Sequence, residues 1–96
     1  MATYIVLGKF TEQGIKTVKD LPNRRAATRA AAESLGITWR EGHLTMGLYD
    51  VVFVLDSPSS EAIAKFVLTL GMRGNLSTQT LRAFSNDEVD ALLSDL

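Results

Sequence analysis

The sequence contains no cysteine, and only one histidine and two prolines occur among its 96 residues. The lack of cysteine excludes disulfides, thiolate nucleophiles and the usual zinc and iron–sulfur centres. A lone histidine, with no cysteine or second histidine to help it, makes a poor metal site. We therefore expect neither a metal nor a cofactor, and nothing in the composition indicates secretion.

An excess of one charge and long apolar runs are also lacking. The formal net charge is −1, and the nearest thing to a basic cluster, Arg24, Arg25 and Arg29, is offset by Asp20 and Glu33. This balance argues against nucleic acid or an anionic membrane as a partner. No apolar run approaches the roughly 20 residues of a membrane-spanning helix, and the first strand-like segment leaves no room for a signal peptide. We expect a cytoplasmic protein.

The residues that are present predict one small globular domain over residues 1–96. Apolar residues make up 46% of the chain, which is enough for a packed core. The length fits a single domain and leaves no room for a second core.

Four strand-like segments differ in polarity. Residues 2–10 and 49–56 are apolar on both alternating faces, which is typical of central strands. Residues 37–46 and 75–84 are more polar, which is typical of edge strands. The central pair is thus the first and third strand, as in the ferredoxin-like order 4-1-3-2.

Three helical segments complete the pattern. Residues 22–35 are rich in alanine and end at Gly36, with Ala27, Ala30, Ala31, Ser34 and Leu35 able to form one face. A second helix is predicted after Ser57 as N-cap and Pro58, and is closed by Gly71 and Gly74. A capping box at residues 85–88 opens a C-terminal helix. We predict an α+β, ferredoxin-like β-α-β-β-α-β sandwich with a four-stranded antiparallel sheet and an added C-terminal helix.

The predicted hairpin between the second and third strands fixes a register. Gly47-Leu48 suits a two-residue type II′ turn, which pairs His43 with Val52 and Trp39 with Asp56. Side-chain alternation then places one set of residues on a single face: Trp39, Glu41, His43, Thr45 and Asp50.

The second apolar face of the central strands needs a cover. Both helices of this fold lie on the same face of the sheet, so the other face would be open to water. A second copy of the chain is the simplest cover, and we expect a homodimer or a higher oligomer.

The residues Gly47-Leu48-Tyr49-Asp50 resemble the Gly-x-Tyr-Asp signature of the GYD domain family. Further similar segments occur in order along the chain: Phe10-Thr11-x-x-Gly14-Ile15-Lys16, Val18-Lys19-Asp20, Arg73-Gly74-Asn75 and Thr78-Gln79-Thr80-Leu81-Arg82-Ala83-Phe84. The resemblance implies a small bacterial or archaeal protein with a dimeric α/β-barrel type of ferredoxin-like fold. It implies no assigned biochemical activity.

The candidate catalytic residues are His43, Asp50 and Tyr49. His43 is the only side chain whose unperturbed pKa lies near neutrality, and Asp50 or Thr45 could orient it as a general base. Alternatively, His43 is a solvent-facing residue of an edge strand. Tyr49 and Asp50 could position a polar ligand group, or they could anchor the turn through packing and backbone hydrogen bonds.

The candidate ligand-binding residues are Trp39, Thr45, Arg73 and Arg82. Trp39 could wall a pocket or serve as an interface anchor. Arg73 lies in a glycine-flanked segment, residues 71–75, that could approach an anion or form a plain turn. Arg82 requires a partner, which Glu41, Asp50, a ligand carboxylate or a second subunit could supply.

Two functions fit these features. The first is an oligomeric binding module for a small organic ligand or a protein partner. The alternative is a cofactor-independent enzyme of the dimeric α/β-barrel type, similar to a monooxygenase or an isomerase. The enzyme hypothesis rests mainly on analogy of fold.

Overall fold

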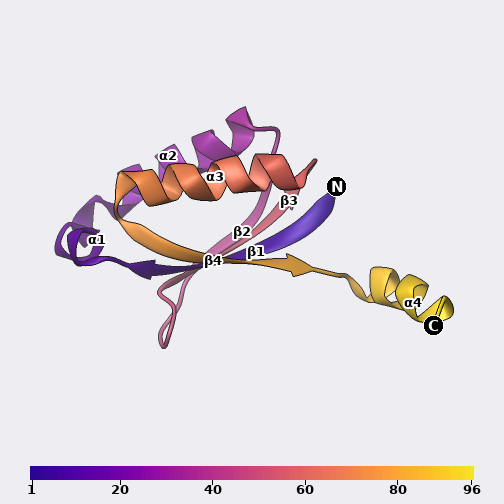
Figure 1. The fold of residues 1–96 in the computed structure, drawn as a ribbon. Coiled ribbons are helices and arrows are strands. Elements are labelled where there is room, and N and C mark those ends of the chain that lie inside the picture. Colours follow the sequence, from indigo (N-terminus) through magenta and orange to yellow (C-terminus); the bar gives the residue numbers. More distant parts are fainter.

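Four antiparallel strands form one sheet in the order β2-β3-β1-β4 in the computed structural model, which describes residues 1–96. The strands are β1 (Ala2–Phe10), β2 (Thr38–Leu44), β3 (Val51–Ser57) and β4 (Leu76–Ala83), and the helices are α1 (Glu12–Lys16), the short 3-10 helix η1 (Val18–Asp20), α2 (Leu21–Ser34), α3 (Ser60–Arg73) and α4 (Asn86–Ser94). Helices α2 and α3 lie side by side on one face of the sheet (Figure 1). The predicted ferredoxin-like α+β fold, with the first and third strands central, is confirmed.

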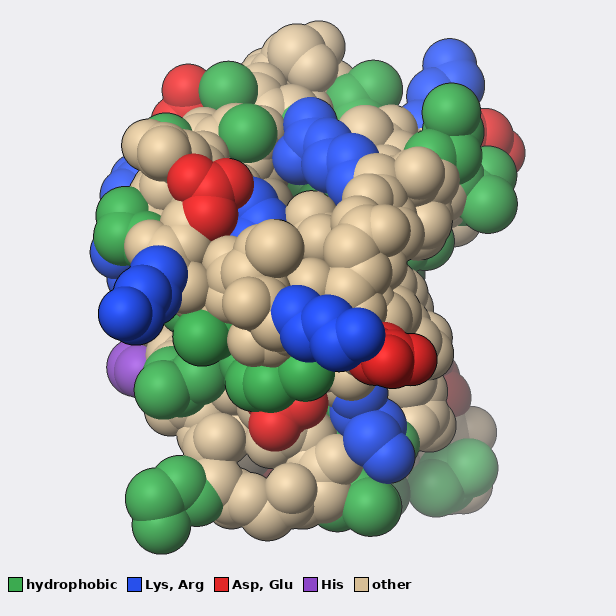
Figure 2. Space-filling view, turned by 90° about the vertical axis from the view of Figure 1, so that its left-hand side faces the viewer, with side chains coloured by type: hydrophobic (Ala, Val, Ile, Leu, Met, Phe, Trp, Pro, Cys, Tyr) green, Lys and Arg blue, Asp and Glu red, His purple; other side chains and the backbone are tan.

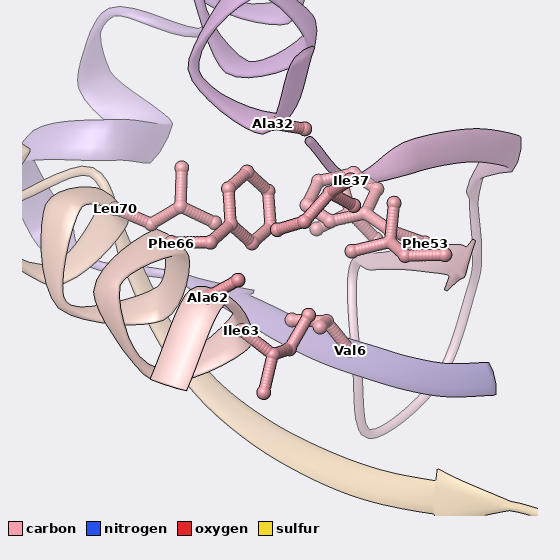
Figure 3. Packing of buried hydrophobic residues seen from close by; sticks show 10 residues of the cluster. Val6, Ala32, Ile37, Phe53, Ala62, Ile63, Phe66 and Leu70 are labelled. Carbon is pink, nitrogen blue, oxygen red and sulfur yellow. The ribbon is translucent and has the colours of Figure 1, made fainter. Parts of the chain in front are cut away.

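The core lies between α3, α2 and the two central strands. Strand β3 alternates between buried and half-buried residues, and its buried residues face the helices. Helix α3 points Phe66 and Leu70 at the sheet, where they meet Phe53 and Ile37, while Val6 of β1 is fully buried (Figure 3). The helical spacing of the apolar residues on α3 therefore gives the face that is buried.

The buried face of α2 differs from the predicted one. Thr28 and Ala32 are buried, with Ala31 and Leu35 partly buried beside them, whereas Ala27 is exposed. Because alanines occupy most of the middle of this helix, the sequence offers little contrast between its faces. The predicted face, which included Ala27, Ala30 and Ser34, was wrong by about one position.

Two predicted helix boundaries also change. Ser57 is the fully buried last residue of β3, where it pairs with Ala2, and it is not the N-cap of α3. Ser59 is the N-cap, and its hydroxyl accepts a hydrogen bond from the Ala62 amide at 3.1 Å. At the other end, Gly71 lies inside α3 and Gly74, with φ +80°, ends the helix alone.

A β-bulge at Arg40 corrects the predicted register of the hairpin. His43 pairs with Val52, as predicted, and the Thr45 amide donates to Asp50 O at 2.7 Å. Trp39, however, pairs with Leu55 rather than with Asp56, because the extra residue in β2 shifts the pairing. Trp39 therefore shares the helix-covered face with Leu55, while His43 shares the opposite face with Val52. The prediction of Trp39 and His43 on one face was wrong.

The opposite face of the sheet carries no helix. Apolar side chains line it from three strands, and none of them is fully buried: Ile5, Leu7, Val52, Val54 and Leu81. Helix α4 extends away from the sheet beyond the end of β4 (Figure 1). Its Leu92 and Leu93 are each more than half exposed. We call the face of the sheet that is formed by Ile5, Leu7, Val52, Val54 and Leu81 the open face.

Candidate functional site

A cavity of about 140 Å³ lies on the helix-covered side of the sheet, between α2, β2 and the end of α3. Its walls are mainly apolar and come from the sheet and from α3: Phe10, Trp39, Val51, Phe53, Leu70 and Leu76. Three arginines, Arg24, Arg25 and Arg73, also line it, and no Asp or Glu does. This is an apolar chamber with positive charge in its walls.

Trp39 forms one wall because of the bulge in β2. Its ring packs on Phe53 with ring centroids 4.9 Å apart, and the Arg29 guanidinium lies 5.8 Å from its centroid. A Cβ on Gly42 would come within 2.8 Å of the Trp39 ring, so glycine at that position leaves room for the ring. The indole is thus fixed by neighbours on both sides.

Arg24 connects α2 to the segment before it. One terminal nitrogen, Nη2, donates to the carbonyl oxygens of Gly14 and Thr17 at 3.1 and 3.0 Å. The guanidinium lies 6.0 Å from the centre of the Phe10 ring. The Nε atom is buried and has no hydrogen-bond partner. Arg24 therefore retains one buried N–H that the protein itself does not satisfy.

The end of α3, which bears Arg73, is held against α1 by a close contact. Gly14 approaches the Asn75 carbonyl so closely that a Cβ there would lie 2.2 Å from its oxygen. The Asn75 carbonyl accepts from the Thr11 amide at 3.1 Å, and the Thr11 hydroxyl donates to Gly74 O at 2.6 Å. Two segments that are far apart in the sequence, residues 10–16 and 73–75, thus form one joint that positions Arg73.

The candidate catalytic residues do not come together as a group. His43 Nε2 lies 3.1 Å from Glu41 Oε2, with both side chains largely exposed, and it contacts neither Asp50 nor Thr45. Because both side chains are exposed, the contact with Glu41 does not hold His43 in a pocket that excludes water. The structure thus places the lone histidine on the exposed edge strand.

Asp50 and Thr45 make backbone hydrogen bonds instead. Asp50 Oδ2 accepts from the Phe10 amide at 2.8 Å, and the Thr45 hydroxyl donates to Tyr49 O at 2.6 Å. The Tyr49 hydroxyl bonds Gln79 of β4. In the signature segment, the aspartate and the tyrosine therefore fasten the hairpin to β1 and β4.

Arg82 has a partner that the sequence did not indicate. Its Nη2 lies 3.1 Å from Glu88 Oε2 at the start of α4, rather than near Glu41 or Asp50, and its guanidinium lies 4.3 Å from the centre of the Phe84 ring. The hydrogen bond from the Ser85 amide, followed by that from Arg82, lowers the pKa of Glu88. Arg82 pairs with Tyr4 near the start of β1 and does not line the cavity.

The family model of the GYD domain matches residues 4–93, which include parts or all of every strand and helix of the structure. This chain belongs to the GYD domain family. It is also 30% identical over 84 residues to the "glutamine synthetase and cystathionine beta-lyase binding protein" of Thermus thermophilus, a match that covers 86% of this chain and 88% of the relative.

The structure of this GYD domain adds two further observations. None of its helices has the length and apolar character needed to cross a bilayer. No group of three or more His, Asp or Glu side chains is placed to hold a metal ion.

The arginines of α2 are the cavity residues that the sequence did not reveal. Arg24 and Arg25 seemed balanced by Asp20, but the Asp20 carboxylate accepts from Asn23 instead, at 2.8 Å. Both arginines precede Thr28 by one helical turn, and the burial of Thr28 against the sheet, which the sequence did not predict, turns them toward the cavity. Of the residues predicted to bind a ligand, Trp39 and Arg73 line the cavity. The candidate catalytic residue His43 borders it from the edge strand, although its cross-strand partner Val52 lies on the opposite face.

Proposed function

We propose that this GYD domain is a non-catalytic binding module that forms a homodimer through its open face and attaches to another protein. The observation that carries the proposal is the pair of uncovered apolar surfaces, the open face and α4. A monomer would leave both in contact with water, and apolar area of this kind marks an interaction site.

The open face is suited to another sheet. Its apolar residues stand on three neighbouring strands, and Leu81 is 39% exposed. Two such faces can pack about 10 Å apart with their side chains interdigitated. A second copy presents the same face, so one surface serves both partners of a twofold dimer.

Helix α4 also requires a partner. It has nine residues, and isolated helices this short are marginal in water even when well capped. Its capping box fixes the start of the helix, with Ser85 and Glu88 exchanging hydrogen bonds. The apolar face that follows contacts no helix of its own chain, so we place it on the second copy.

The name of the Thermus relative supports a protein partner. That relative is named for binding glutamine synthetase and cystathionine β-lyase, and we extend the protein-binding role to this chain. The hairpin tip, which we define as residues 44–48, offers a surface for it: Leu44, Met46 and Leu48 are 68%, 97% and 72% exposed. Flexible apolar side chains on a loop are suited to adaptable protein contacts.

Light scattering after size-exclusion chromatography tests the dimer. We expect a dimeric mass at micromolar concentration, and a monomeric mass for Val54→Lys on the open face, because a charge there would be buried unpaired. The matched control is Leu68→Lys on the exposed outer side of α3, which should remain dimeric. A monomeric mass of the unmodified protein contradicts the proposal.

Biolayer interferometry with immobilised, purified glutamine synthetase tests the partner. We expect binding that Met46→Asp weakens, whereas Met72→Asp, at a methionine of α3 that is 87% exposed, leaves it unchanged. Repeating the titration with cystathionine β-lyase shows whether the same tip serves both enzymes. Absence of binding to either enzyme removes the support for a protein partner of this kind.

A further inference from the structure

We propose that the cavity beside α2 is a binding site for a small monocarboxylate that carries one ring or branched alkyl group. The site lies on the helix-covered side of the sheet, opposite the open face, and thus goes beyond the protein-binding role proposed above. Its carboxylate would meet the arginines, and its apolar part would fill the chamber.

The positive charge of the cavity has no counterpart within the chain. The ion pairs of the structure involve Lys16, Arg40, His43 and Arg82, and none involves Arg24, Arg25 or Arg73. No acidic side chain lines the cavity. Figure 2, which views the molecule from the α1 side, shows Lys and Arg side chains beside hydrophobic ones on this end, with some Asp and Glu side chains among them. An anion is the complementary ligand.

The arginines in the cavity wall indicate where the anion binds. The Nε atom of Arg24 is shielded by its burial and does not serve as a binding group. The remaining guanidinium nitrogens of Arg24 are committed in part, because Nη2 holds the Gly14 and Thr17 carbonyls. A carboxylate would instead meet the guanidinium groups of Arg25 and Arg73, which hold no other part of the protein, and the planar arginine group matches a carboxylate in shape.

The apolar walls favour a carboxylate with a hydrophobic group over inorganic phosphate. The cavity measures about 140 Å³, close to the roughly 150 Å³ of an engineered cavity that accepts benzene. Phe10, Trp39 and Phe53 give it aromatic walls. The amide of Gly74 is already bonded to Gly71 O at 3.1 Å, so the turn after α3 does not form the cradle of free N–H groups typical of phosphate sites.

The single tryptophan provides the readout, because Trp39 lines the cavity and no other indole emits. Phenylacetate is the probe, and phenylacetamide is its neutral counterpart of the same shape. We expect phenylacetate to change the Trp39 emission saturably at millimolar concentration, and phenylacetamide to bind at least about tenfold more weakly, since charge-assisted hydrogen bonds to arginine are lost.

Arg24→Met is not a suitable test, because it removes the bonds to α1 and can unfold the domain. The decisive variants are Arg73→Met and Arg25→Met, since neither guanidinium holds another part of the protein. Each should weaken phenylacetate binding several-fold. Lys65→Met, which removes a charge from the exposed side of α3 two turns from Arg73, should leave it unchanged.

Three results would overturn the proposal: no saturable change with phenylacetate, equal binding of the amide, or equal weakening by Lys65→Met. Light scattering of the same samples separates this proposal from the previous one. A monomer that binds phenylacetate refutes only the dimer, and a dimer that does not bind it refutes only the carboxylate site.

Discussion

Replacing Gly14 with alanine should break the joint between α1 and the end of α3. The added Cβ would lie 2.2 Å from the Asn75 carbonyl oxygen and 3.0 Å from its carbon, both atoms of the backbone. No side-chain rotation can relieve this contact. The Asn75 peptide also cannot move freely, because its carbonyl accepts the Thr11 amide and the neighbouring Gly74 carbonyl accepts the Thr11 hydroxyl.

The magnitude follows from opposing terms. Overpacking typically costs about 1–3 kcal/mol, and a displaced hydrogen bond adds about 0.5–1.5 kcal/mol. Alanine is favoured over glycine in a helix by about 1 kcal/mol, which offsets part of the cost. We expect Gly14→Ala to lower the free energy of unfolding by about 2 kcal/mol and the Tm by on the order of 10 °C for a domain of this size.

The matched control is Gly71→Ala in α3, where a Cβ meets nothing within 4 Å. That variant should be more stable than the unmodified protein by about 0.5–1 kcal/mol, because only the helix propensity changes. Urea unfolding followed by circular dichroism, at one fixed protein concentration, compares the three proteins. If Gly14→Ala is as stable as Gly71→Ala, the close contact at Asn75 does not exist in solution and the account of how Arg73 is positioned fails.

Two further changes test the hairpin anchor and the start of α4. Asp50→Asn should lower the free energy of unfolding by on the order of 1 kcal/mol, since the hydrogen bond from the Phe10 amide loses its charge assistance; thermal unfolding measures this, and an unchanged Tm would count against the anchor. The lowered pKa of Glu88 means that its carboxylate stabilises α4 fully above its ordinary pKa of 4.5 and loses this effect as the pH falls through the lower, folded-state value. The protection of the α4 amides against exchange, taken relative to the intrinsic exchange rate at each pH, should therefore fall under acidic conditions, and Glu88→Gln should lack this pH dependence.

The sequence by itself determined the order of the elements and the topology. The first and third strands are apolar along both alternating faces, which is typical of central strands, whereas the second and fourth are more polar and lie at the edges. The spacing of Ile63, Phe66 and Leu70 likewise determined the buried face of α3, because a 3.6-residue period places them on one side. Local chemistry also sufficed at Ser85, whose capping box with Glu88 is present as predicted.

Features that depend on contacts between distant parts of the chain could not be predicted from the sequence. The alanine-rich α2 has no strong apolar stripe, so its rotation, and with it the placement of Arg24 and Arg25, is decided by packing on the sheet. A bulge has no sequence signature here, and the single extra residue at Arg40 is enough to send Trp39 and His43 to opposite faces.

The cavity itself exists only in the tertiary structure. Its walls come from residues spread from Phe10 to Leu76, and their meeting depends on how α2, α3 and the sheet settle against one another. Periodicity reports which face of an element is apolar, and it carries no information on which elements leave a gap between them. The sequence therefore determined a sheet with two apolar faces, and only the packing of the helices decided that one face encloses a chamber lined with arginines while the other remains open.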